Sequence, residues 1–283
     1  MGRIVISTES GADIPKDLVE KHQIQVVPMH IIMDGKDYFD GELPVEQVFD
    51  YHRVTKKIPS TAATNEHEYQ ELFTRIRDES PDSIIIHIGY TSKASVSFQS
   101  ALNAAEGFKD INLIDALNVT GGLAAIVIYA AVLLEEEPSI DPVDLIEKIK
   151  SIVPKSRLAF IPGSLDFLRA GGRVSNIAYI GGALLKIKPC IELKEGKLVS
   201  TRKYRGNMMN VAEKLLRDYL NEYAIERKQL YLIYSIGLDE SIKQRMNEIA
   251  IEEGFENVTW MQAGAMISTH AGPGGFGIAG IER

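Results

Sequence analysis

The chain has 283 residues, of which 45% are hydrophobic and 25% are charged, and its formal net charge at pH 7 is −8. This composition is typical of a globular protein with one large or two ordinary domains, and the negative charge argues against nucleic-acid binding. The single cysteine, Cys190, excludes an internal disulfide framework, and the opening "MGRIVIST" lacks signal-peptide architecture. We therefore expect a cytoplasmic protein.

The first half of the chain alternates short apolar runs with helical stretches. The strands are predicted at residues 3–8, 24–33 (interrupted by Pro28), 83–89 and 111–115, and the helices at 15–22, 65–76 and 95–107. Unalternating apolar strands joined by helices are typical of a parallel sheet that is covered on both faces. We therefore predict an α/β fold with a mostly parallel N-terminal sheet.

Residues 116–134 carry no charge, and this run is close to the length that a membrane span requires. However, Asn118, Thr120 and the pair Gly121-Gly122 interrupt its beginning, and Glu135 follows its end. We therefore predict a helix that is buried against a sheet rather than a transmembrane segment.

The second half has a different pattern, which predicts a mixed α/β sheet domain. Residues 157–163 predict a strand, followed by a helix that begins after Ser164 and stops near Gly171. Residues 187–204 predict two antiparallel strands joined by a turn at Glu195-Gly196. A boundary near Val153 divides the chain into domains of residues 1–154 and 155–283.

The segment "THAGPGGFGIAG" (269–280) contains the G-x-G-x-x-G spacing of a dinucleotide-binding loop at Gly275, Gly277 and Gly280. That fingerprint needs a helix opening at its end and an acidic residue about 20 positions further on. Only three residues follow Gly280, so the context does not fit. We expect these glycines to form a turn and a close-packed last strand.

Hydroxyl side chains and one histidine stand in loops where a ligand would be expected. Thr61 lies in "PSTAATN", Ser95 and Ser97 begin a helix after a buried strand, and His270 adjoins a glycine-rich turn. Ligands of open α/β sheets bind beyond the carboxyl ends of strands, and free N–H groups at a helix start favour an anion. Two interpretations stay open: the hydroxyls cap the following helices, or they bind an anion.

Several enzyme classes find no support in the sequence. There is no G-x-S-x-G motif, and no pair of the six histidines has a metal-ligand spacing. We assign no catalytic residue, no metal and no cofactor. The alternative is an enzyme that acts on an acyl or phosphorylated small molecule with His270 as general base.

These stretches, in this order, resemble the DegV family of fatty-acid-binding proteins over nearly the whole chain. "STESGADIP" resembles the family's D-S-x-x-D-L-P, with Glu9 for Asp, and "PSTAAT" resembles P-x-T-S-Q-P, with Ala62 for Ser. "KASVSFQSA" resembles L-S-G-T-Y-Q-S-A, with Val96 for Gly and Ser97 for Thr. "VVPMHIIMDGKDYFDG", "LDFLRAGGRVS" and "STHAGPGGFG" are similar to further family motifs.

The resemblance implies a two-domain α/β protein that holds one long-chain fatty acid in a tunnel between its domains. The carboxylate would lie at Thr61 and Ser95, with His270 close by. FakB-type members of the family present the carboxyl group to a separate FakA-type fatty acid kinase, which makes acyl phosphate from ATP. The chain would then be a non-catalytic carrier subunit in lipid transport and phospholipid synthesis. The implied supporting ligand loops contain Val96, Ser97, Gly272 and Gly274.

This acidic chain carries a group of basic side chains. They would form a docking face for such a kinase, or they are ordinary solvated positions on strands. The members of this group are Lys186, Lys188, Lys194, Lys197, Arg202, Lys203 and Arg205. Arg173, after two glycines, would extend the docking face or form a salt-bridged turn. We propose Arg173, Arg202, Lys203 and Arg205 as the docking residues.

Overall fold

The computed structural model describes residues 2–174 and 187–283. Sheet A belongs to the first half of the chain, and its strands follow the order β2-β1-β6-β7 with parallel neighbours throughout. Its strands are β1 (Ile4–Glu9), β2 (Gln25–Val27), β6 (Ile84–Gly89) and β7 (Ile111–Asp115). The predicted parallel sheet is therefore confirmed.

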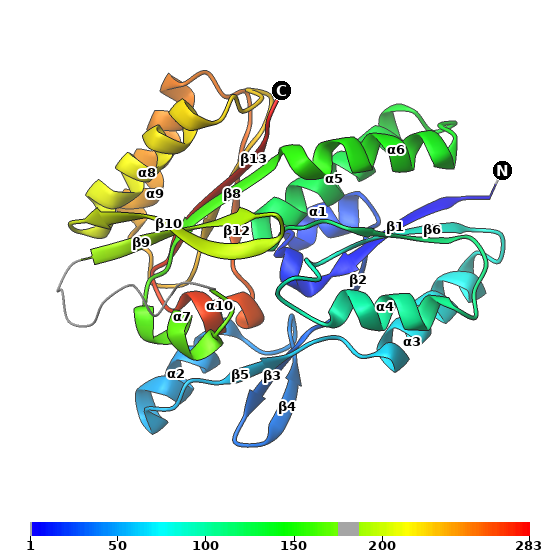
Figure 1. Cartoon of the computed structure of the whole chain (residues 1–283), viewed down its shortest axis with the longest axis horizontal. Helices are drawn as coiled ribbons and strands as arrows, with labels where there is room; N and C mark the ends of the chain where they lie inside the picture. Colours follow the sequence, from blue (N-terminus) through cyan, green and yellow to red (C-terminus); the bar gives the residue numbers. More distant parts are fainter. Residues whose placement is uncertain (1, 175–186) are drawn as a thin grey trace.

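Helices cover both faces of sheet A. Successive side chains of a strand point to opposite faces, so Val5 packs with α3 and α4 whereas Ile6 packs with α5. Figure 1 shows α3 and α4 below the sheet and α5 above it. The helices of this half are α1 (Lys16–Lys21), α2 (Val45–Thr55), α3 (Glu66–Glu79), α4 (Ser97–Ala105), α5 (Thr120–Glu136) and α6 (Pro142–Ile152).

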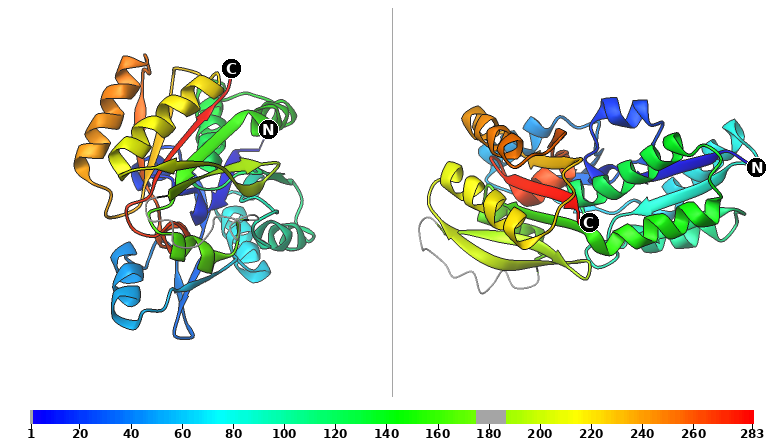
Figure 2. Two further views of the ribbon diagram at one scale, coloured as in Figure 1. Left: turned by 60° about the vertical axis from the view of Figure 1, so that its left-hand side comes forward. Right: turned by 90° about the horizontal axis from the view of Figure 1, so that it is seen from above.

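Sheet C belongs to the second half and is mixed, with the order β10-β9-β8-β13-β11-β12. The last strand of the chain, β13, lies between β8 and β11 and is antiparallel to both. The helices α8 (Met208–Glu222) and α9 (Glu240–Glu252) pack against one face, as Figures 1 and 2 show. The strands are β8 (Ser156–Ile161), β9 (Ile187–Lys194), β10 (Lys197–Arg205), β11 (Leu230–Tyr234), β12 (Val258–Gln262) and β13 (Phe276–Ile281).

Most of the uncharged run, from Thr120 onward, lies in α5, which contacts strands of both sheets. Twelve residues of this helix are buried, so the predicted burial against a sheet is confirmed and includes a second sheet. Within the described ranges, no helix combines the length and apolar character that crossing a membrane requires. Sheets A and C thus share one central helix, and a division between residues 154 and 155 stays a prediction.

A small antiparallel sheet, sheet B, was not predicted. It contains β3 (His30–Met33), β4 (Lys36–Phe39) and β5 (Ser60–Ala62), in the order β4-β3-β5. The predicted strand region 24–33 is split at Pro28, so its first part joins sheet A and its second part joins sheet B. Proline lacks an N–H donor and interrupts the ladder at this point.

Two turn predictions are confirmed in detail. Glu195 and Gly196 both have positive φ angles, 50° and 78°, as a type I′ hairpin turn requires. In β13, a Cβ at Gly277 would lie 3.0 Å from Cβ of Phe160, and one at Gly280 would lie 2.7 Å from Cγ2 of Ile225. These glycines therefore serve close packing of the last strand.

Two short helices face the space between the sheets. α7 (Leu165–Gly171) begins after Ser164, which occupies the N-cap position without a side-chain hydrogen bond. The predicted stop at Gly171 is confirmed, and Gly172 follows it in the left-handed conformation with φ 66°. α10 (Ala265–Ala271) follows β12 and leads into the glycine-rich turn. Two 3₁₀ turns, Ser10–Ala12 and Val153–Lys155, complete the described elements.

Candidate functional site

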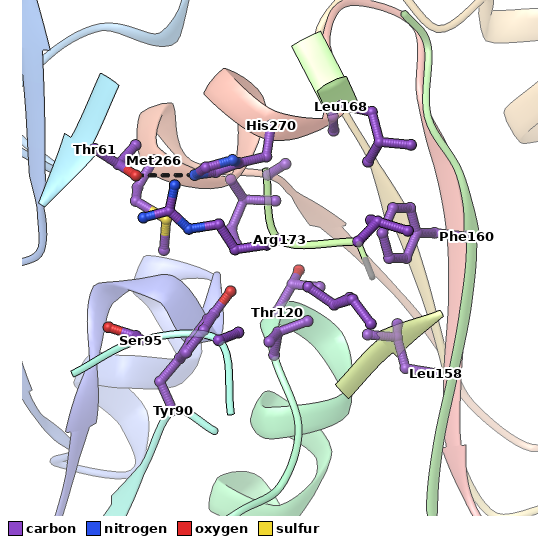
Figure 3. A pocket seen from close by; sticks show the side chains of 18 of the residues that line it. Thr61, Tyr90, Ser95, Thr120, Leu158, Phe160, Leu168, Arg173, Met266 and His270 are labelled. Atoms are coloured by element: carbon purple, nitrogen blue, oxygen red, sulfur yellow. Dashed lines mark hydrogen bonds between the residues drawn. The ribbon is translucent and has the colours of Figure 1, made fainter. Parts of the chain in front are cut away.

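A cavity of about 590 Å³ lies between sheet C, the start of α5, α10 and the loops after β5 and β6. Its size is within the range of small-molecule sites. Leu158, Phe160 and Ile233 from sheet C form an apolar wall, together with Leu168 from α7. Figure 3 shows Leu158, Phe160 and Leu168 on one side of the cavity.

Polar side chains gather at the other end of this cavity, which we call the polar end. Thr61 on β5 and His270 on α10 meet there, with 2.9 Å between Oγ1 and Nε2. Ser95, Tyr90 and Arg173 also line it, and Figure 3 shows these five residues around the same end. The structure thus brings together Thr61, Ser95 and His270, which are distant in sequence.

The imidazole of His270 is held neutral at pH 7. Burial, followed by the nearby positive charge of Arg173, lowers the pKa of His270 to about 4. The Nδ1 atom is buried and has no hydrogen-bond partner among the described residues. A Cβ at Gly171 would lie 2.2 Å from Nδ1, so the α-hydrogen of this glycine points at that nitrogen. The contact favours a bare Nδ1 and a proton on Nε2.

Arg173, which the sequence analysis assigned to the docking face, lines the polar end. Its Nη1 donates to the carbonyl oxygen of Gly171 at 2.6 Å, which holds the guanidinium group next to the end of α7. The residue is nevertheless exposed, as is Val96, which also lines the cavity and is 70% exposed. The polar end therefore lies at an opening of the cavity.

The loop before α4 carries the predicted hydroxyls, and they have different roles. Ser95 lines the cavity, and its Oγ accepts a hydrogen bond from the N–H of Ser97 at 3.1 Å. Ser97 is fully buried behind the loop and donates to the carboxylate of Glu9 at 3.2 Å. Glu9 also accepts from the N–H of Tyr90 at 2.8 Å and from the hydroxyl of Tyr69 at 2.6 Å. The Glu9 carboxylate therefore holds this loop in place.

The threonine hydroxyls that precede α3 do not cap this helix. Asn65 caps this helix by accepting from the N–H of Glu68, whose side chain accepts from the N–H of Asn65 in turn. Thr64 donates to the carbonyl of Pro28, and Thr61 contacts His270. The capping interpretation is thus wrong for Thr61.

The glycine-rich turn shapes the wall without directing its N–H groups into the cavity. Gly272 and Gly274 have φ angles of 70° and 76°. Their N–H groups donate to the carbonyls of Ser268 and Ile236. Neither lines the cavity, whereas Gly275 does.

Several of the predicted basic docking residues have partners within the chain. Arg202 on β10 forms ion pairs with Glu192 and, at 2.8 Å, with Glu222. Lys203 and Arg205 lie exposed on the same strand. Lys186 falls outside the described residues.

The remaining chemical candidates were Cys190 and a metal site. Cys190 is fully buried in β9, where burial raises the pKa of its thiol to about 12. Across residues 2–174 and 187–283, no group of three or more His, Cys, Asp or Glu side chains is arranged to hold a metal ion.

An α/β fold with an apolar cavity that ends in hydroxyls, a neutral imidazole and a guanidinium is typical of proteins that enclose an amphipathic anion. Comparison with known proteins gives the family. A model described as an uncharacterised protein of the DegV family matches residues 3–283, and the chain belongs to this family.

Individual relatives agree in fold and in length. The chain is 32% identical to a DegV domain-containing protein of Caldanaerobacter subterraneus, and the match covers both chains completely. It is 27% identical to a fatty acid-binding protein of Thermotoga maritima, over 99% of each chain. A solved DegV family structure from Thermus thermophilus, described as fatty-acid-binding, has a TM-score of 0.87, 25% identity and coverage of 99% and 100%.

The predicted family and two-sheet α/β fold are therefore confirmed. The fatty acid binding described for the Thermotoga maritima and Thermus thermophilus proteins agrees with the expectation of a non-catalytic binding protein.

Proposed function

We propose that this chain binds a long-chain fatty acid in the cavity between its two large sheets. The observation that carries the proposal is the division of the cavity into an apolar wall and a polar end where Thr61 and His270 meet. A fatty acid has the same division. Burying about 15 methylene groups at about 0.8 kcal/mol each is worth about 12 kcal/mol before ordering costs are subtracted.

The polar end suits a carboxylate through charge and hydrogen bonding. A proton on Nε2 of His270 is donated to Oγ1 of Thr61, which leaves the hydroxyl proton of Thr61 free for the ligand. Ser95 provides a second hydroxyl, and Arg173 provides the positive charge. A buried carboxylate needs such partners because an unpaired one costs several kcal/mol.

The alternative of an enzyme with His270 as general base receives less support. A base with a pKa of about 4 is a weak proton acceptor at pH 7. In addition, Nε2 is already engaged with Thr61. Turnover of an ester or acyl phosphate by the purified protein, lost in His270→Ala, would favour the enzyme.

The same cavity supports a role as carrier for a FakA-type fatty acid kinase. The polar end lies at the opening bordered by Val96 and Arg173, so a carboxyl group there is within reach of a partner. Lys203 and Arg205 extend an exposed basic strand, and we assign the kinase to this face together with Arg202 and Arg173. Since such a kinase uses ATP, we place the protein in the cytoplasm and in lipid transport toward phospholipid synthesis.

Titration with palmitic acid tests the binding proposal. The variants Thr61→Ala and Ser95→Ala, alone and combined, should keep the fold. Each lost hydrogen bond to a charged group is worth about 1.5–3 kcal/mol, so each single variant should bind at least about 10-fold and the double variant at least about 100-fold more weakly. Ser60→Ala is the matched control, because Ser60 is exposed beside Thr61 and does not line the cavity. Unchanged affinity of the double variant would contradict the carboxylate assignment.

Kinase-dependent formation of acyl phosphate tests the carrier role. Charge reversal at Lys203 and Arg205 should reduce the rate of product formation while palmitic acid binding stays unchanged. Equal rates for this variant and the unchanged chain would remove these residues from the docking face.

A further inference from the structure

Two buried carboxylates contact the first turn of α10, the helix that carries His270. Asp13 and Asp40 are 7% and 5% exposed. Asp13 accepts a hydrogen bond from the N–H of Gly264 at 2.8 Å, and Asp40 accepts one from the N–H of Met266 at 3.1 Å. Both acids come from the first half of the chain, whereas α10 belongs to the second half. The contact therefore crosses between the halves.

The residue at the start of α10 is adapted to these two acids. A Cβ at Gly264 would lie 3.0 Å from an oxygen of Asp40 and 3.1 Å from an oxygen of Asp13. Both distances are shorter than ordinary van der Waals contact, so glycine lets the carboxylates approach closely. The start of α10 thus sits between two side chains of the other half.

Asp40 attaches α10 to the sheet that also carries Thr61. Asp40 directly follows β4, and its own N–H donates to the carbonyl of Met29, just before β3. Thr61 lies on β5 of the same sheet B and contacts His270. α10 is therefore bonded to sheet B at both ends, through Asp40 at its start and through His270 near its end.

Asp13 attaches the same helix to the cavity wall formed by α5. Its second oxygen lies 2.5 Å from Oγ1 of Thr120, the first residue of α5 and a lining residue of the cavity. Met266 and His270 lie four residues apart on one face of α10, and both line the cavity. Figure 3 shows Thr120, Met266 and His270 around the same space. Asp13 thus fixes two walls of the site relative to each other.

Burying two carboxyl groups at the start of a short helix costs free energy of desolvation. Burial, and for Asp13 also the proximity of Asp40, raises the pKa of both carboxyls, that of Asp13 well above its usual value. Asp13 and Asp40 lie where α10, α5 and sheet B meet. Buried polar groups at such a junction can fix the relative positions of the elements even when they add little stability.

We infer that Asp13 and Asp40 are positioning residues for the polar end, which set the place of His270 relative to Thr61 by fixing the start of α10 to sheet B and α5. The inference rests on the proposed binding function. Neither acid lines the cavity, so both act through α10 rather than on the ligand.

The test compares Asp13→Ala with Asp13→Asn, and adds Asp40→Ala. In the parent, Asp13 accepts from both the N–H of Gly264 and the hydroxyl of Thr120. In Asp13→Asn the side-chain oxygen still accepts from Gly264 and the amide group donates to Oγ1 of Thr120, whereas alanine loses both contacts. Two readouts are used: palmitic acid affinity, and the ring ¹⁵N resonances of His270 in ligand-free protein. We expect at least a fivefold loss of affinity and shifted His270 resonances in the alanine variants, with recovery in Asp13→Asn. Asp141→Ala, which removes the cap of α6 far from the cavity, is the matched control and should change neither readout.

Two outcomes would overturn the inference. One is that Asp13→Ala and Asp40→Ala both fold and keep the palmitic acid affinity and the His270 resonances of the parent. The other is a loss of affinity in Asp13→Ala that Asp13→Asn does not recover. If the alanine variants do not fold, Gly264→Ala displaces the start of α10 with both acids present and should shift the same resonances. A parent protein that binds no palmitic acid contradicts the proposed function alone, because the His270 resonances are measured without ligand.

Discussion

The two ends of the cavity are built in different ways. The polar end is assembled from β5, the loop before α4, the residues after α7 and the helix α10, which are held together by individual hydrogen bonds such as that between Thr61 and His270. The apolar wall comes mainly from strands of one sheet, where Leu158, Phe160 and Ile233 project from the face that α8 and α9 do not cover.

This difference determines how each end responds to substitution. In the apolar wall, the two-residue repeat of the strands sets the positions of the side chains. Removal of one methylene group there therefore lowers affinity only by a small amount. At the polar end each atom has few alternative partners, so one displaced group removes a defined contact. We therefore expect larger effects at the polar end, and the following predictions test this order.

The largest effect is expected for Gly171→Ala. The added methyl group would lie 2.2 Å from Nδ1 of His270, so the ring or the end of α7 must move. Overpacking of this kind typically lowers the free energy of unfolding by about 1–3 kcal/mol. Chemical denaturation and palmitic acid titration should both register the change. Gly107→Ala is the control, since nothing lies within 4 Å of its new Cβ, and equal behaviour of the two variants would contradict the packing of His270 described above.

Arg173→Met should weaken palmitic acid binding while it preserves most of the side-chain volume. Loss of one charge-assisted hydrogen bond costs about 1.5 kcal/mol at an exposed position, or about 10-fold in affinity. The pKa of His270 should also rise, because the charge of Arg173 contributes to its depression. NMR titration of the imidazole measures this rise. A variant with parent affinity and an unshifted pKa would place Arg173 outside the polar end.

The depressed pKa of His270 predicts a pH dependence of stability. Between pH 6.5, the ordinary value of the unfolded chain, and about 4, the unfolded state binds a proton that the folded state does not. The free energy of unfolding should therefore fall as the pH is lowered through this interval, by at most about 1.4 kcal/mol per pH unit from this group. Denaturation of His270→Gln should show a shallower fall, and parallel curves for the two proteins would show that His270 titrates normally.

The smallest effect is expected for Leu158→Val at the apolar wall. Leu158 is 3% exposed and lines the cavity, and the change removes one methylene group. Affinity for palmitic acid should fall by about 0.8 kcal/mol, which is about fourfold. A loss larger than that of Arg173→Met in the same titration would reverse the order of the two ends.

Much of the fold was predictable because its strands carry local signals. Residues 83–89 form an unbroken apolar run, and Glu195-Gly196 supplies the residues that a tight hairpin turn needs. Sheet B carries weaker signals, because the Asp34-Gly35 turn between β3 and β4 is local but β4 is largely exposed and β5 has only three residues. The pairing of β3 with β5 depends on contacts between segments about 30 residues apart, which periodicity within one segment does not report.

The site was predictable in part, for similar reasons. Thr61, Ser95 and His270 lie next to predicted strand ends or glycines. The family resemblance implied that all three lie around one carboxylate. Arg173 was assigned to docking as an extension of the basic group, and nothing local shows that the chain returns toward the cavity. Asp13 was missed because its partners Thr120 and Gly264 are 107 and 251 residues away.

Mass spectrometry of an organic extract from natively purified protein tests the central claim most directly. We predict a long-chain fatty acid in stoichiometric amount, either from the expression host or after incubation with a mixture of fatty acids. An extract that stays empty after that incubation would contradict fatty acid binding and would indicate another anionic ligand for the polar end.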